Sequence, residues 1–119
     1  MGYGVHSVFS KTLAGGASQT TLPFNVERAY DHMYLQVATM ASVANISLDV
    51  SADGGETYYQ LRHTPPFATA TVTVPTFIVA ATAAANGAMV PIPTGFRHFR
   101  VVVDSAPTAA VGFKVICGA

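Results

Sequence analysis

The residues that could carry chemistry are concentrated in one short stretch, Ser-Ala-Asp-Gly-Gly-Glu-Thr-Tyr. Ser51, Asp53, Gly55 and Thr57 occupy alternating positions in it. The oxygen atoms of Ser and Asp can accept hydrogen bonds from the amides of a tight turn, and glycine adopts backbone conformations that other residues avoid. We therefore predict that these four residues build a hairpin turn and have a structural role.

Two other interpretations of this stretch concern known motifs. Asp49, Ser51 and Asp53 have the spacing that begins a calcium-binding loop, but position twelve is Gln60, where such a loop needs a bidentate glutamate. The stretch also resembles the Asp box, Ser-x-Asp-x-Gly-x-Thr-aromatic, found at hairpins in sialidases and other β proteins, with Tyr58 in place of the usual Trp or Phe. This resemblance implies a folded turn outside any catalytic site.

The remaining chemistry-bearing residues do not form a recognisable catalytic or metal-binding pattern. None of the histidines stands in the spacing of a metal motif, and no Gly-x-Ser-x-Gly elbow occurs. A glycosidase needs two carboxylates across a cleft, whereas half of the six here cluster at one turn. We expect no enzymatic activity, no metal and no cofactor. The histidines are His6, His32, His63 and His98.

Aromatic and basic residues suggest an interface or ligand patch. In the run that precedes position 101, alternation places Phe96, His98 and Arg100 on one face of a strand. Tyr58 and Tyr59 follow the predicted turn and could stack against sugar rings. Such a patch would hold an acidic neighbouring subunit or a glycan. An ordinary solvent face with an extended arginine remains the alternative.

Strands must position these side chains, because the dominant hydrophobic period is two. Ile46, Leu48 and Val50 alternate with polar residues, which is typical of a half-buried strand. A further strand over 57–62 follows the turn. The segment 80–88 is rich in alanine and is predicted to be a loop or one helical turn. The same alternation recurs in the ranges 5–9, 22–26, 33–37, 71–74, 99–103 and 111–115.

The pattern predicts about eight strands in one domain, residues 1–119, with residues 1–4 as a flexible arm. Short strands separated by turn signals favour a β-sandwich with jelly-roll or related Greek-key topology. An immunoglobulin-like sandwich is the runner-up, but its Cys, Trp and Cys signature is missing from a chain with one cysteine, Cys117, and no tryptophan.

Composition limits the partners of this domain. Charged residues make up 10% of the 119 residues and the net charge is zero, against about 25% charged residues in a typical soluble domain. Six scattered basic residues do not suggest nucleic-acid binding, and no apolar run is long enough for a membrane span. Low charge instead favours a surface covered by partners, including copies of the chain. The lone cysteine and the lack of a secretory leader predict assembly in a reducing cytoplasm.

The chain resembles the small head decoration, or cement, proteins of tailed bacteriophages. The resemblance lies in its Ala/Thr/Val-rich composition, the hairpin 46–55, the run 93–103, and the segments 105–110 and 113–117. It implies a jelly-roll or similar sandwich without catalytic residues. Such a protein would be a virion structural protein on the capsid surface, often a homotrimer, that binds the major capsid protein and reinforces the shell.

Two competing functions stay open at this stage. One is a carbohydrate-binding or fibre-tip domain that uses exposed tyrosine and arginine side chains. The other is a minor capsid or tail component, which differs from a decoration protein in its position and copy number.

Overall fold

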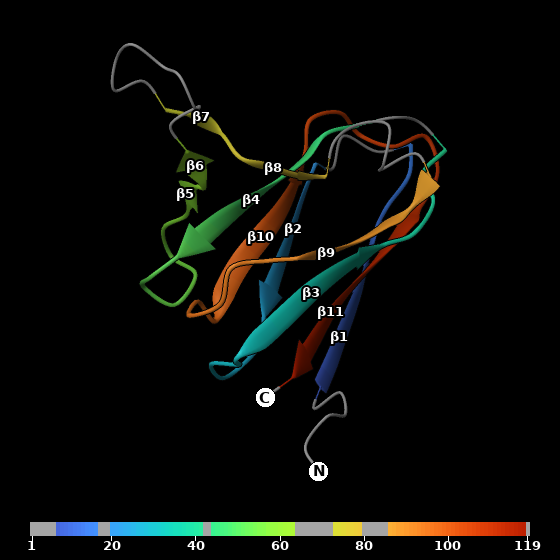
Figure 1. Cartoon of the computed structure of the whole chain (residues 1–119). Helices are drawn as coiled ribbons and strands as arrows, with labels where there is room; N and C mark the ends of the chain where they lie inside the picture. The colour runs from blue at the N-terminus through green and yellow to red at the C-terminus, as the bar shows by residue number, and fades with distance from the viewer. Residues whose placement is uncertain (1–6, 17–19, 42–43, 64–72, 80–85, 119) are drawn as a thin grey trace.

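The computed structural model describes residues 7–16, 20–41, 44–63, 73–79 and 86–118, and these contain eleven strands (Figure 1). The predicted arm at residues 1–4 lies outside them. So do residues 80–85, which make up most of the predicted loop or helical turn. The strands are β1 (Ser7–Leu13), β2 (Thr21–Asn25), β3 (His32–Val37), β4 (Ile46–Ser51), β5 (Tyr59–Gln60), β6 (Arg62–His63), β7 (Val74–Pro75), β8 (Phe77–Val79), β9 (Ala88–Pro91), β10 (His98–Val103) and β11 (Val111–Gly118).

Two antiparallel sheets pack face to face as a β-sandwich (Figure 1). Sheet A has the order β1-β11-β3-β9, and sheet B has the order β2-β10-β4-β5, with β8 also paired to β4. The first four strands pair in turn with the last four: β1 with β11, β2 with β10, β3 with β9, and β4 with β8. This arrangement is one long hairpin wrapped into two sheets, which is a jelly roll. It differs from the immunoglobulin-like order considered above.

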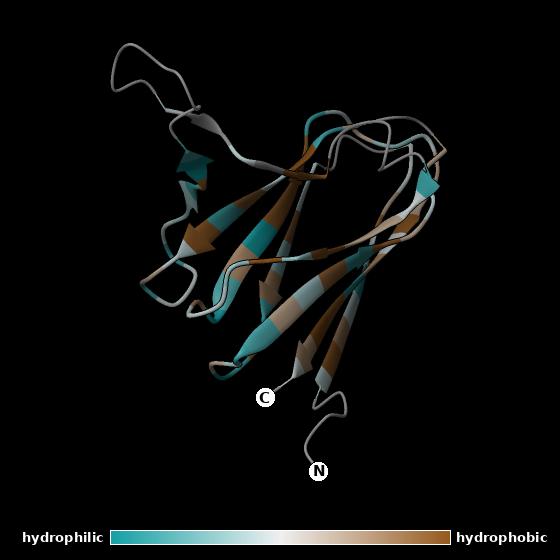
Figure 2. Cartoon of the chain, in the orientation of Figure 1, coloured by the Kyte–Doolittle hydropathy of each residue, from teal (hydrophilic) through white to brown (hydrophobic). Residues whose placement is uncertain are grey.

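The core forms where the apolar positions of the two sheets face each other. Along β3 and β11, buried and exposed residues alternate strictly over most of their length, as period-two burial requires. In sheet B, Phe24 and Phe99 are cross-strand partners whose rings stack with centroids 5.5 Å apart. The same alternation is visible along the strands in Figure 2. Cys117 is fully buried, as predicted for a small apolar residue.

Several local predictions need correction. The alternation indicates no strand over 77–79 or 89–91, yet pairing with β4 and β3 forms β8 and β9 there. Strand β9 begins at Ala88, the last residue of the predicted loop or helical turn. The single strand predicted over 57–62 is two short strands, β5 and β6. Strand β10 begins at His98, so Phe96 precedes it instead of lying on it. Among the described residues, no helix is long and apolar enough to cross a membrane.

The stacked pair in sheet B supplies a stability prediction with an internal control. Phe99 is 2% exposed. Tyr59, which aligns with Phe99 through Val50 on the strand between them, is 69% exposed. We expect Phe99→Ala to lower the free energy of unfolding by about 3–5 kcal/mol, because it leaves a cavity in the core. Tyr59→Ala should change it by less than about 0.5 kcal/mol. Urea denaturation measures both, and equal effects would contradict the assigned register.

Candidate functional site

The turn between β4 and β5 is built by the side chains of Ser51 and Asp53. The Ser51 hydroxyl donates to Asp53 Oδ1 at 2.7 Å and accepts from the amide of Gly55 at 3.0 Å. The amide of Thr57 donates to Asp53 Oδ1 at 2.8 Å. These bonds lower the pKa of Asp53 from 3.8 to about 2, and the bond from the Ser51 side chain has the largest effect. The four predicted motif residues therefore meet in one turn.

Two glycines give this turn its shape. Gly54 and Gly55 have φ values of 79° and 93°, in the region that side chains disfavour. A Cβ on Gly55 would lie 3.3 Å from both His98 Nδ1 and Tyr58 Oη, whereas one on Gly54 would point into open space. The absence of a side chain at Gly55 thus lets the turn, Tyr58 and His98 pack together.

A partly buried ion pair lies next to the turn on the outer face of sheet B. Arg100 Nε donates to Asp49 Oδ2 at 2.7 Å, and the two residues are cross-strand partners. The Arg100 guanidinium also lies over the Tyr58 ring, 4.6 Å from its centroid. Asp49 is only 8% exposed, although its alternation predicts a solvent-facing position. The reason is that Arg100 and its neighbours cover it, since a buried carboxylate needs a partner.

The structure divides the predicted ligand patch. Tyr58, His98 and Arg100 are brought together around the turn and the ion pair. Tyr59 aligns with Val50, which packs against the core, so it lies at the sheet edge and not in the patch. Neither tyrosine enters the core, contrary to the common behaviour of adjacent strand residues.

Phe96 lies on the wall of a pocket of about 240 Å³ between the β4–β5 turn and the segment before β10. We call it the Phe96 pocket. Arg97 also lines this pocket, although alternation along the chain places it on the face opposite Phe96, His98 and Arg100. No signal in the sequence indicates the pocket, because it depends on the approach of two turns. Its lining residues are Ser51, Ala52, Gly54, Gly95, Phe96, Arg97 and His98.

The described residues show no arrangement of three or more His, Cys, Asp or Glu side chains that could hold a metal ion. The two carboxylates of the calcium-like spacing have separate partners, since Asp49 pairs with Arg100 and Asp53 accepts bonds within its turn. His63 contacts the Thr76 hydroxyl at 2.8 Å, away from the turn. The site therefore offers aromatic, guanidinium and main-chain groups for non-covalent binding.

The same region of sheet B thus holds a rigid turn, a paired arginine and a small pocket. Its chemistry suits recognition of a polar ligand or a neighbouring protein. Searches for relatives found no match to any family model, any curated protein or any solved structure.

Substitution of the two turn glycines separates backbone strain from crowding. Gly54→Ala introduces strain alone, which costs about 1–3 kcal/mol. Gly55→Ala adds the contacts with His98 and Tyr58, so we expect it to lower the free energy of unfolding more than Gly54→Ala does. The two denaturation midpoints measure this, and a smaller loss for Gly55→Ala would contradict the packing described.

The lowered pKa of Asp53 predicts a pH dependence of stability. Its folded-state pKa lies below its ordinary value of 3.8, so its stabilising contribution is present above that value and disappears as the pH falls toward about 2. Asp53→Asn should lack this component. Thermal melts of both proteins between pH 5 and 2 should therefore converge toward acid, and a constant difference between their melting temperatures would contradict the assignment.

Proposed function

We propose that the chain is a virion structural protein, a decoration or cement subunit that stabilises a capsid through protein–protein contacts. It is assembled in the host cytoplasm and lies on the capsid surface. Its partners are the major capsid protein and other copies of itself, with a homotrimer favoured. The observation that carries the proposal is the distribution of exposed apolar and charged side chains over the jelly roll.

Exposed apolar side chains concentrate on the outer face of sheet A. Among the described residues, four large hydrophobic side chains are exposed, and three of them lie on this face: Val8 at 51%, Tyr34 at 41% and Met89 at 57%. Val8 aligns through Ile116 with Tyr34 and then with Pro91, so one apolar row crosses all four strands. Stable monomers rarely expose contiguous apolar surface of this kind.

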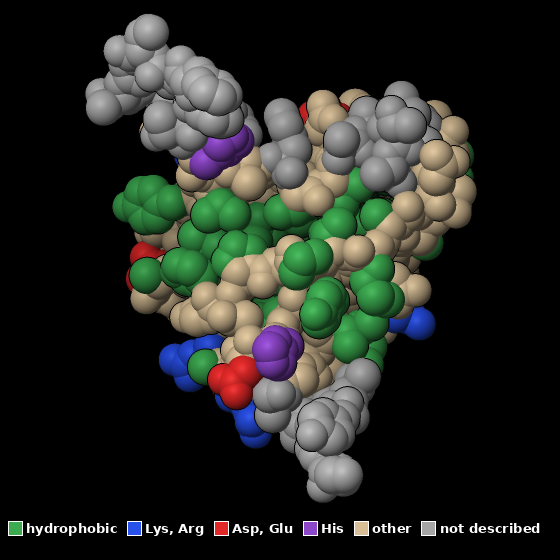
Figure 3. All heavy atoms as spheres, in the orientation of Figure 1, with side chains coloured by type: hydrophobic (Ala, Val, Ile, Leu, Met, Phe, Trp, Pro, Cys, Tyr) green, Lys and Arg blue, Asp and Glu red, His purple; other side chains and the backbone are tan. Residues whose placement is uncertain are grey.

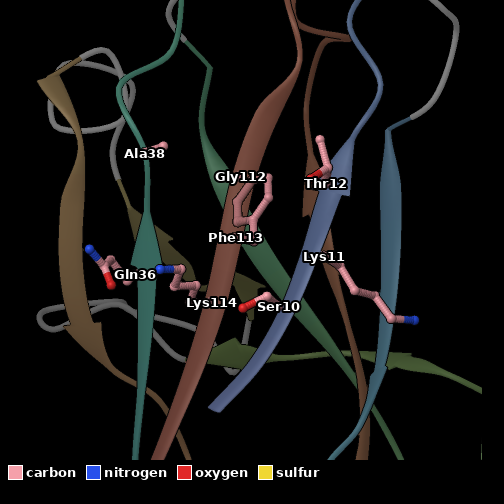
Figure 4. Close-up of a pocket in the computed structure, with 8 residues that line it drawn as sticks. All are labelled: Ser10, Lys11, Thr12, Gln36, Ala38, Gly112, Phe113 and Lys114. Atoms are coloured by element: carbon pink, nitrogen blue, oxygen red, sulfur yellow. The ribbon is translucent and has the colours of Figure 1, made fainter.

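Charge is nearly missing from the same face. Within the described part of sheet A, Lys114 is the one Lys, Arg, Asp or Glu whose register position places it outward. It lines a depression of about 270 Å³ over Gly112, beside Ser10 and Gln36. Figure 4 shows that Lys11 points away from that depression toward β2. Apolar, aromatic and weakly charged surface is typical of the core of an interface.

The two ends of the sandwich also differ in charge. The described residues that follow or precede strands at one end of the sandwich, which we call the neutral end, include one charged residue, Asp104. The Asp104 carboxylate accepts a hydrogen bond from the amide of Asn45. The residues of this end are 14–16, 20, 38–41, 44–45, 86–87 and 104–110.

The opposite end, the charged end, is formed by the segments 26–31, 52–58 and 92–97. In Figure 3 the charged side chains in view lie mainly along its lower rim. A decoration subunit would direct its neutral surfaces toward proteins and its charged end toward solvent. Half of the chain's charged residues lie in these segments: Glu27, Arg28, Asp31, Asp53, Glu56 and Arg97.

A carbohydrate-binding or fibre-tip domain is the second candidate. It is favoured by Tyr59, which is 69% exposed at the edge of sheet B, and by the Phe96 pocket. Jelly rolls serve both as viral capsid domains and as lectins. A stable monomer that does not bind particles would favour this candidate over the decoration subunit.

Addition of the purified chain to capsids assembled without it tests the proposal. We expect saturable binding at symmetric positions and a higher temperature of capsid disruption. Tyr34→Lys places a charge in the apolar row and should weaken binding at least about tenfold. Ala29→Lys adds the same charge at an exposed position of the charged end and should bind like the unmodified chain.

Co-sedimentation with the capsids measures the binding. Recovery of the unmodified chain in the supernatant at all concentrations would contradict the decoration role. Equal weakening by Tyr34→Lys and Ala29→Lys would contradict the assignment of sheet A as the docking face.

A further inference from the structure

We propose that the Phe96 pocket binds a single sugar ring that carries a carboxylate, at the end of an acidic glycan. This binding site is an activity beyond capsid stabilisation, and it is argued from its own residues. Three observations support it: the size and bare walls of the pocket, an arginine without a partner, and an aromatic ring beside a histidine.

The pocket has the size and the open walls that a small ligand needs. Its volume of about 240 Å³ is below the range of about 300–1,000 Å³ typical of sites for drug-sized molecules, so it suits one ring. Gly54 and Gly95 line it with φ values of 79° and 95°, and a Cβ on either would meet no atom within 4 Å. Bare main chain on both sides therefore lets hydroxyl groups approach peptide groups closely.

Arg97 supplies an unoccupied cation. The other three arginines of the chain have partners: Arg28 lies over Tyr30, Arg62 bonds Gln60 and Thr73, and Arg100 bonds Asp49. The Arg97 side chain is exposed and has no hydrogen bond or ion pair within the described part of the chain.

The backbone of Arg97 is nevertheless fixed, because its carbonyl oxygen accepts from the amide of Val26 at 2.9 Å. Its exposed guanidinium is free to turn toward a ligand in the pocket, and a guanidinium can bind a carboxylate through two parallel hydrogen bonds.

Phe96 and His98 complete the site. Both are half-buried lining residues, so each presents part of its ring while the rest is held by the fold. The apolar face of a pyranose ring can pack on Phe96, and the nitrogen atoms of His98 can bond hydroxyl groups. His98 is held in place by its pairing with Ser51 and by its contact with Gly55.

The acidic residue nearest in sequence to the lining is engaged elsewhere. Asp53 stands between Ala52 and Gly54 but is not itself a lining residue. Its Oδ1 accepts from Ser51 and Thr57 within the turn. Its negative charge lowers the affinity for an anion but does not close the pocket. We therefore expect a dissociation constant in the millimolar range for a single sugar, which corresponds to a binding free energy of about −4 kcal/mol.

The pocket lies at the charged end, away from the neutral end and from the apolar row of sheet A. A subunit docked through those neutral surfaces would leave the pocket open to solvent. If the proposed decoration role holds, the particle would display many copies of a weak site, and binding to an acidic polysaccharide would be strengthened by multivalency.

Titration of the ¹⁵N-labelled chain with sodium glucuronate tests the proposal by NMR. We expect saturable shifts of the amides of Gly54, Gly95 and His98. Glucose should bind at least about tenfold more weakly, because it cannot form the charged hydrogen bonds with Arg97. Arg97→Gln should weaken glucuronate binding by a similar factor. Arg28→Gln removes the same charge from the same end, outside the lining, and should have little effect.

Four results would overturn the proposal. These are a lack of saturable shifts at the three amides, equal affinity for glucose and glucuronate, equal losses in Arg97→Gln and Arg28→Gln, or equal shifts and affinity with sodium acetate, which would indicate an adventitious ion only. The capsid-binding assay does not depend on the pocket. Failure of the decoration proposal and failure of the sugar-binding proposal can therefore be told apart.

Discussion

The packing of two apolar sheet faces against each other is the constraint on which the rest of this molecule depends. The long hairpin must wrap so that the strands of both sheets direct most of their large apolar residues inward, and the stacked rings of Phe24 and Phe99 lie within this layer. Because side chains alternate with a period of two, a slip of one residue would exchange core and surface on a whole strand. The register of β10 with β2 and β4 is therefore fixed by the core, and that register positions everything on the outer face of sheet B.

The outer face shows how that register determines the site. Arg100 lies opposite Asp49, and His98 lies opposite Ser51, because Phe99 and Val101 must face the core. The carboxylate of Asp49 is stabilised in its buried position by the guanidinium that the register supplies. The turn that follows β4 then brings Tyr58 over the same guanidinium. The residues that pack the core and the residues that form the surface site therefore alternate along the same strands.

Because the chain has few charged residues, the position of each one helps to distinguish its surfaces. Arg28 makes a cation–π contact, Arg62 donates hydrogen bonds and Arg100 forms an ion pair, which leaves Arg97 available beside a pocket. The apolar row of sheet A and the neutral end together form a surface suited to protein contact. The opposite end concentrates charge and carries the pocket. This distribution of charge supports the two proposals made above, an assembly surface and a separate ligand-binding surface.

The sequence by itself determined the all-β class, the turn at Ser51–Thr57 and most of the strands, because alternation and turn chemistry are local properties. It also identified Tyr58, His98 and Arg100 as candidates for one patch. Only the tertiary structure decided that β8 and β9 are strands, that Asp49 is buried, that Tyr59 lies at the sheet edge away from Tyr58, and that Arg97 lines a pocket with Phe96. These outcomes depend on which strands pair and which turns meet, and both are set by contacts between residues that are far apart in the chain.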